Sequence, residues 1–237
     1  MDVKPSATAD GSDFADGCDF MKPRIKICCI SSIEEANLAI ACGAAALGLV
    51  GKMPSGPGVI SDAEIFEIAN RVPPPIATFL LTSETRSSDI VAHYKKVRTN
   101  TIQIVDELRE RTYHEIRAAL PGVKLVQVIH VLDEGSVTEA CELAASVDAI
   151  LLDSGNPNLA VKELGGTGRV HNWDLSRRIV ETCGKPVFLA GGINSENVRE
   201  AFEKVQPFGF DLCSSVRTDG RLDRAKLEDF FSEIEKL

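Results

Sequence analysis

The feature that most constrains this fold is a regular alternation of short apolar segments with segments of helical periodicity. The apolar segments are rich in β-branched residues, and each is followed by a stretch whose apolar residues recur every three to four positions. The expected strands span residues 24–30, 45–50, 76–81, 101–105, 123–131, 148–153, 186–190 and 209–213. The expected helices span residues 33–42, 61–72, 87–97, 109–120, 136–145, 174–183, 195–205 and 223–237.

Strand–helix units in strict alternation predict a parallel sheet, because parallel neighbours need a long crossover that is usually helical. Eight units are the number that closes a TIM (β/α)8 barrel. We therefore expect an α/β fold, with a single-domain (β/α)8 barrel over residues 23–237 and a short disordered N-terminal extension over residues 1–22. A doubly wound open sheet is the alternative, but residues 28–32 stand where its glycine fingerprint usually follows the first strand.

The acidic net charge of the chain limits the classes of partner that we expect it to bind. Its formal net charge is -9, which argues against nucleic-acid and membrane-surface roles because both favour basic faces. Seven cysteines at irregular spacing are typical of free thiols in a reducing compartment. The N-terminus lacks the basic and apolar regions of a secretory signal, and no apolar run is long enough to span a bilayer. The sequence predicts a cytoplasmic protein with a small-molecule partner.

Two strand ends carry side chains suited to acid–base chemistry. Cys28 lies at the end of the first expected strand and Asp153 at the end of the sixth, and such ends form the active site of a barrel. A carboxyl group with a raised pKa serves as a general acid, and a thiolate serves as a base. Taken singly, Cys28 is explained as core and Asp153 as a helix cap or ion-pair residue. The pair at one mouth favours proton transfer on a phosphorylated sugar.

Glycine- and serine-rich loops after the last strands indicate a phosphate site. The loops after strands seven and eight of such barrels commonly hold a phosphate with backbone N–H groups and a short helix N-terminus. The candidate residues are Gly191 and Gly192 after the seventh strand, Ser214 and Ser215 after the eighth, and Gly166 in an earlier glycine loop. A lone glycine pair is equally typical of a turn, so the prediction depends on the combination.

Three polar residues are weaker candidates for substrate binding, namely Lys52, Gln103 and His130. A solvated loop position explains Lys52 as well, and an ordinary polar rim explains His130. His93 and His114 fall within expected helices, which places them on the outer surface. The four histidines show no metal-ligand spacing, so no metal site is predicted.

Five segments, in this order, resemble the motifs of the phosphoribosylanthranilate isomerase family. They are Lys26–Ile30, Leu151–Ser154, Gly165–Gly168, Leu189–Ile193 and Asp211–Ser215, and the resemblance extends from about residue 24 to the C-terminus. It implies a TIM barrel and a cofactor-free Amadori rearrangement in tryptophan biosynthesis. It also implies that Asp153 protonates the ribose ring oxygen, that Cys28 removes the C2 proton, and that the two late loops hold the phosphate.

The sequence departs from this family pattern mainly on the side that holds the anthranilate ring. Cys29 stands in place of a glycine, Gly58 of an arginine that contacts the anthranilate, Val105 of a histidine, and Arg217 of a glutamate. These changes fit an isomerase with altered anthranilate binding, or a relative that acts on another phosphorylated amino sugar. A phosphometabolite-binding barrel without catalysis is a third possibility, against which the retained acid and thiol speak.

Overall fold

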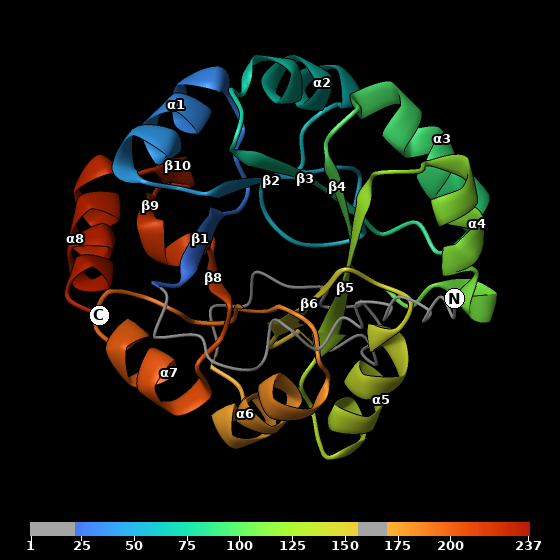
Figure 1. The fold of residues 1–237 in the computed structure, drawn as a ribbon. Coiled ribbons are helices and arrows are strands. Elements are labelled where there is room, and N and C mark those ends of the chain that lie inside the picture. The colour runs from blue at the N-terminus through green and yellow to red at the C-terminus, as the bar shows by residue number, and fades with distance from the viewer. Residues whose placement is uncertain (1–21, 156–169) are drawn as a thin grey trace, which may run out of the picture.

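The computed structural model describes residues 22–155 and 170–237, in which eight parallel strands form a barrel inside a ring of helices (Figure 1). The barrel strands are β1 (Arg24–Ile27), β2 (Ala46–Val50), β3 (Ala77–Thr82), β4 (Thr101–Ile104), β5 (Lys124–His130), β6 (Ala149–Asp153), β7 (Val187–Leu189) and β8 (Gly209–Leu212). The helices are α1 (Ile33–Cys42), α2 (Asp62–Arg71), α3 (Ser87–Val97), α4 (Tyr113–Ala119), α5 (Gly135–Ala144), α6 (Trp173–Thr182), α7 (Val198–Val205) and α8 (Arg224–Glu235). The expected extension over residues 1–22, apart from Lys22, and the glycine loop with Gly166 lie outside the described residues.

The barrel is closed, which confirms the predicted (β/α)8 fold. Strand β1 pairs in parallel with β2 on one side and with β8 on the other, and every strand from β2 to β7 pairs with its two sequence neighbours. An open doubly wound sheet would leave two edge strands, so that alternative is wrong. Closure brings the first and the last strand side by side.

Two apolar layers hold the barrel together. One lies between the strands and the helix ring, where side chains such as Ile27, Leu47 and Leu80 are fully buried. The other fills the barrel interior and includes Phe79 and Phe188, whose rings meet edge to face at 6.1 Å between centroids. Because strand side chains alternate between the two layers, the inward-facing set is fixed by the register.

Two helices begin later than the sequence predicts. The segment expected as one helix over 109–120 contains the 3-10 turn η1 (Arg109–Arg111), and α4 starts only at Tyr113. Glu110 and Arg111 have φ values of 56° and 49°, which an α-helix cannot accommodate. The helix expected from Ser195 starts at Val198, because the preceding residues form a turn held by side-chain to backbone hydrogen bonds.

The expectation that His93 lies on the outer surface is wrong. This side chain is buried on α3, between the strands and α2. Its Nδ1 lies 3.2 Å from the Thr82 hydroxyl and its Nε2 3.1 Å from Asp62 Oδ1. A β-carbon at Gly51 would lie 2.5 Å from the imidazole ring, so the absence of a side chain there makes room for it.

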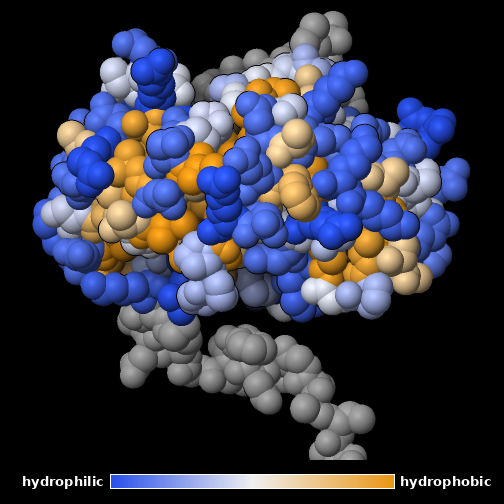
Figure 2. Space-filling view, turned by 90° about the horizontal axis from the view of Figure 1, so that it is seen from above, coloured by the Kyte–Doolittle hydropathy of each residue, from blue (hydrophilic) through white to orange (hydrophobic). Residues whose placement is uncertain are grey.

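The outer surface of the helix ring is mixed in character. Figure 2 views the molecule from above Figure 1, the side on which α1, α2 and α3 lie, and shows hydrophilic residues with smaller apolar patches between them. Phe66 of α2 is one of the exposed large apolar residues. No helix within residues 22–155 and 170–237 has the length and apolarity needed to span a bilayer.

Candidate active site

The C-terminal half of the barrel interior carries a set of buried polar and thiol side chains. The alternation of the strands turns them inward, whereas a neighbour such as Gln127 points outward and accepts a hydrogen bond from Tyr113 of α4. The set comprises Lys26, Cys28, Gln103, His130, Asp153 and Asp211. Four of the residues predicted from the sequence, Cys28, Gln103, His130 and Asp153, therefore share one barrel mouth.

A buried ion pair lies beneath this mouth. Lys26 of β1 and Asp211 of β8 are direct partners in the β1–β8 ladder, and Lys26 Nζ lies 2.8 Å from Asp211 Oδ1. Burial lowers the pKa of Lys26, but the adjacent carboxylate outweighs it, so this pKa is above its ordinary value and the amine is charged. The ammonium also lies 5.4 Å from the centre of the Phe79 ring.

Cys28 lies close to this ammonium group. A β-carbon built on Gly48 of β2 would lie 2.8 Å from Cys28 Sγ and 3.0 Å from Lys26 Nζ. Both groups therefore converge on the space above Gly48, which only a residue without a side chain leaves open. Cys28 is 6% exposed, and its backbone N–H extends the β1–β8 ladder by donating to Leu212 at 2.7 Å.

Asp153 ends β6 and is buried. Its Oδ1 accepts a hydrogen bond of 2.7 Å from the Ser154 backbone N–H. Burial raises the pKa of this carboxyl, although the Ser154 N–H and the charges of His130 and Lys26 oppose the shift. A raised pKa suits a carboxyl group to donating a proton to a bound molecule.

His130 and Gln103 line the neighbouring strands. His130 is the register partner of Asp153, and its Nε2 lies 3.3 Å from the Val105 carbonyl oxygen. Gln103 is buried, and its Oε1 has no hydrogen-bond partner among the described residues. A buried, unsatisfied amide oxygen costs free energy, which makes Gln103 a natural acceptor for a ligand hydroxyl or N–H group.

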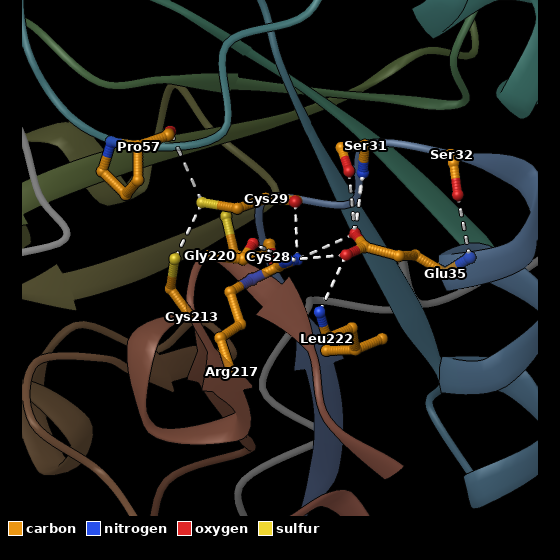
Figure 3. Close-up of polar contacts among 10 residues, drawn as sticks. All are labelled: Cys28, Cys29, Ser31, Ser32, Glu35, Pro57, Cys213, Arg217, Gly220 and Leu222. Atoms are coloured by element: carbon orange, nitrogen blue, oxygen red, sulfur yellow. Dashed lines mark hydrogen bonds and ion pairs between the residues drawn. The ribbon is translucent and has the colours of Figure 1, made fainter.

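The chain that leaves β1 is fixed by a guanidinium group (Figure 3). Arg217 Nη2 donates to the carbonyl oxygens of Cys28 and Cys29 at 3.1 and 2.6 Å, and Nη1 lies 2.9 Å from Glu35 Oε1. Glu35 also accepts from the backbone N–H of Leu222 at 2.8 Å. Arg217, which follows β8, thus binds groups of the first strand–helix unit.

Both predicted phosphate loops lie at the same end of the barrel. Gly191 and Gly192 follow β7 with φ values of 78° and 67°, and the Gly192 carbonyl accepts hydrogen bonds from two asparagine side chains of the same turn. Ser214 and Ser215 open the 3-10 turn η2 (Ser214–Val216) after β8. Both glycines occupy the left-handed region, which a residue with a side chain rarely adopts.

Lys52 lies apart from this set. It is exposed in the loop between β2 and α2, and its backbone carbonyl accepts from the Ser83 hydroxyl at 3.1 Å. A cavity of about 330 Å³ adjoins Ser215, but it opens between the β7–α7 loop and α8 and is lined by none of the inward-facing set. Within the described residues, no group of three or more His, Cys, Asp or Glu side chains is arranged to hold a metal ion.

The sequence interpretation did not include Lys26, Asp211 or Arg217 among the candidate site residues. The signal for the first two was present, because each charged residue stands between two buried apolar residues of its strand. Recognising them as partners required the closure of the barrel. For Arg217, no local pattern indicated that its partners would be carbonyl groups almost 190 positions earlier.

These features define a class, the (β/α)8-barrel enzymes that carry their chemistry at the C-terminal ends of the strands. The family model of N-(5'-phosphoribosyl)anthranilate (PRA) isomerase matches residues 25–233. The chain belongs to this phosphoribosylanthranilate isomerase family.

Relatives and solved structures agree with this membership. N-(5'-phosphoribosyl)anthranilate isomerase 1 of Methanosarcina mazei is 34% identical over 230 residues, which cover 90% of this chain and 95% of the relative. The isomerase of Methanosarcina acetivorans is 33% identical over 227 residues, covering 90% and 94%. The crystal structure of phosphoribosylanthranilate isomerase from Thermotoga maritima has a TM-score of 0.75 at 25% identity, covering 91% of this chain and 100% of that chain. A second such structure, in complex with reduced 1-(o-carboxyphenylamino)-1-deoxyribulose 5-phosphate, has the same TM-score of 0.75 at 24% identity and covers the same 91% and 100% of the two chains.

Two of the departures from the family pattern are neighbours in space. Cys29 has a φ of 62° and Gly58 a φ of 77°, so both occupy the left-handed region that favours glycine. A β-carbon at Gly58 would lie 2.4 Å from the β-carbon of Cys29, which is closer than two carbons approach. The Cys29 Cα and Sγ would each lie 2.9 Å from the same β-carbon, so the backbone and the side chain of Cys29 together leave no room for a side chain at position 58.

Proposed function

We propose that this protein catalyses the Amadori rearrangement of N-(5'-phosphoribosyl)anthranilate to 1-(o-carboxyphenylamino)-1-deoxyribulose 5-phosphate. The observation that carries the proposal is the placement of a buried carboxyl and a buried thiol, Asp153 and Cys28, on inward positions of one barrel mouth in a member of the isomerase family. The reaction is a step of tryptophan biosynthesis, and the composition favours the cytoplasm as its location.

Asp153 is the general acid in this proposal. Its raised pKa keeps a proton available, which passes to the ribose ring oxygen as the C1–O bond breaks. The anilino nitrogen supplies the electron pair, so the open form is a protonated Schiff base at C1. The buried position of Asp153 also keeps bulk water away from that carbon.

Cys28 is the general base. Its thiolate takes the proton from C2, the electron pair moves into the C1–C2 bond, and the C1–N electron pair returns to nitrogen to give an enolamine. The enolamine becomes the C2 ketone when C1 takes up a proton and the C2 hydroxyl releases one. The Lys26 ammonium supports this step because it places a positive charge beside the thiolate. Arg217 acts as a positioning residue, since it holds the carbonyl groups of Cys28 and the following residue.

The phosphate and the aryl group of the substrate would lie on opposite sides of these two groups. The backbone N–H groups near Gly191, Gly192, Ser214 and Ser215 suit the phosphate, and Gly166 belongs to the same proposal. Gln103 and His130, which line the mouth from β4 and β5, would contact the ribose hydroxyls. Lys52 is the cation of the β2–α2 loop that would meet the anthranilate carboxylate.

A second substrate is favoured by one observation. The position of the family arginine, Gly58, has no room for a side chain against Cys29, so the carboxylate contact of the family pattern is missing. An amino-sugar phosphate without that carboxylate would not require it. Comparing kcat/KM for N-(5'-phosphoribosyl)anthranilate and for the corresponding aniline analogue distinguishes the two substrates, because only the first carries the carboxylate.

The acid and base roles are tested by Asp153→Asn and Cys28→Ser. We expect each variant to lower kcat for phosphoribosylanthranilate by about 10²–10⁴-fold with a small change in KM, because each removes a proton-transfer group without removing a binding group. The matched controls are Asp174→Asn and Cys42→Ser, on the outer helices α6 and α1. Unchanged turnover in Asp153→Asn would overturn its role, and failure of the wild-type gene to rescue a tryptophan-requiring strain lacking the isomerase would overturn the function.

A further inference from the structure

Two thiols meet at the mouth of the barrel. Cys29 follows β1 and Cys213 follows β8, and their sulfur atoms lie 2.8 Å apart (Figure 3). This separation is longer than the ~2.05 Å of a disulfide bond, so both are free thiols. The β1–β8 ladder and the Arg217 bridge hold the two chain segments, which makes the approach of the thiols a property of the closed barrel.

The surroundings of the two sulfurs differ. Cys29 is buried against the β2–α2 loop, where its Sγ donates to the Pro57 carbonyl at 3.6 Å, whereas Cys213 is partly exposed. The shared hydrogen bond lowers the pKa of the Cys213 thiol, with a further contribution from the Arg217 guanidinium, and it raises the pKa of Cys29. Cys213 is therefore the sulfur that ionises first and meets solvent first.

We propose that Cys29 and Cys213 form an oxidation site, a dithiol that peroxide converts into a disulfide joining the ends of β1 and β8. The Cys213 thiolate attacks one oxygen of hydrogen peroxide, the O–O bond breaks, and hydroxide leaves to take up a proton as water. The product is a sulfenic acid on Cys213. Cys29 sulfur then displaces the hydroxyl group, the S–S bond forms, and the Cys29 proton leaves with that hydroxyl as a second water.

The disulfide would act on the proposed catalytic apparatus from both sides. Cys29 directly follows the proposed base Cys28, and Cys213 directly precedes Ser214 of the proposed phosphate loop. Closing the gap moves Cys29 away from its Pro57 contact and shifts the backbone that carries Cys28. Displacements of about 1 Å near reacting groups cost up to ~100-fold in rate, so we expect kcat to fall by about tenfold or more and to recover on reduction.

The experiment treats the full-length protein with one equivalent of hydrogen peroxide, followed by tryptic mapping and an isomerase assay before and after dithiothreitol. We expect a peptide that links residues 27–52 to residues 205–217, together with a reversible loss of turnover. In Cys213→Ser and in Cys29→Gly, both the linked peptide and the reversible loss should disappear. Cys29→Gly suits the left-handed backbone at that position, and Cys141→Ser controls for an exposed thiol.

Each outcome bears on the proposal. Absence of the linked peptide in the wild type overturns the oxidation site, and a linked peptide that persists in Cys29→Gly overturns Cys29 as the partner, since the peptide 27–52 also carries Cys28 and Cys42. A linked peptide with unchanged turnover overturns the effect on catalysis. The mapping does not depend on isomerase activity, so a protein that is inactive even when reduced contradicts the proposed function and leaves the peptide test decisive.

Discussion

Lys26 and Asp211 are direct neighbours across the β1–β8 ladder, and their side chains form a 2.8 Å ion pair inside the barrel. A buried ion pair is rarely worth more in folding free energy than two well-packed apolar residues, because both charges lose their water. This ion pair has a further role, because the Lys26 ammonium lies beside Cys28 and its charge opposes the rise in the pKa of Asp153. The ion pair therefore bears both on the stability of the barrel and on its proposed chemistry.

Removing one partner tests how the ion pair affects the free energy of unfolding. We expect Lys26→Met to lower the free energy of unfolding by about 3–5 kcal/mol at neutral pH, because it leaves the Asp211 carboxylate buried without its partner. The double variant Lys26→Met/Asp211→Asn should recover a large part of that loss. Urea denaturation of the four proteins of the cycle measures it, and a double variant no more stable than Lys26→Met would contradict the pairing.

The contact of Cys29 with Gly58 predicts an energetic coupling. We expect Gly58→Ala to lower the free energy of unfolding by about 2 kcal/mol or more, from the left-handed backbone and the overlap with Cys29. About 1 kcal/mol should return when Cys29→Gly is added. Gly220→Ala is the control, since it has nearly the same φ of 78° and open space around the new methyl group. Equal costs at the two glycines would disprove the overlap.

The raised pKa of Asp153 predicts a pH-dependent gain in stability from Asp153→Asn. A carboxyl group whose pKa is higher in the folded state stabilises the fold while protonated, and this contribution is lost as the pH rises through the folded pKa. The amide cannot ionise, so the variant should be more stable than the wild type at neutral pH, and the difference should shrink on acidification. Denaturation midpoints across the acid range measure it. A difference that does not change with pH would speak against a raised pKa.

The lowered pKa of Glu35 predicts the opposite pH dependence of stability. Burial raises its pKa, but hydrogen bonds from Arg217 and from the Leu222 and Ser31 N–H groups outweigh this and leave the pKa below 4.5. Its contribution to stability is therefore present above that value and is lost as the pH falls through the folded pKa. Glu35→Gln should lower the melting temperature at neutral pH and flatten its decline in acid. The exposed Glu203→Gln of α7 should leave both unchanged, and a Glu35→Gln curve parallel to the wild type would refute the linkage.

The fold was largely predictable from the sequence because local patterns determine it. The helix start at Ser61 is an example, since its hydroxyl and Glu64 form the reciprocal capping box that the local residues favour. The starts of α4 and α7 were predicted too early. Left-handed residues precede α4, and asparagine side chains form a turn before α7, so neither helix can begin at the predicted position. The short hairpin of β9 (Arg217–Thr218) and β10 (Arg221–Leu222) was not predicted, because two-residue strands carry no periodic signal.

The candidate site was predictable only where strand position determined it. Asp153 ends β6 and Cys28 directly follows β1, so both were identified from strand position, and alternation then turns both inward. The prediction for His93 was wrong because the helix pattern does not identify its hydrogen-bond partners, Thr82 and Asp62. Lys26 was overlooked because its partner comes from the far end of the chain.

The Arg217 bridge has a consequence for how the protein is made. Its guanidinium comes from the segment after β8, and the groups that it holds belong to the first strand–helix unit. A nascent chain on the ribosome therefore carries Cys28 for nearly the whole of translation before the residues that fix it exist. The site is completed only when the last strand and the turn after it leave the exit tunnel, so fragments lacking the final unit should contain most of the barrel's strands and none of its proposed activity.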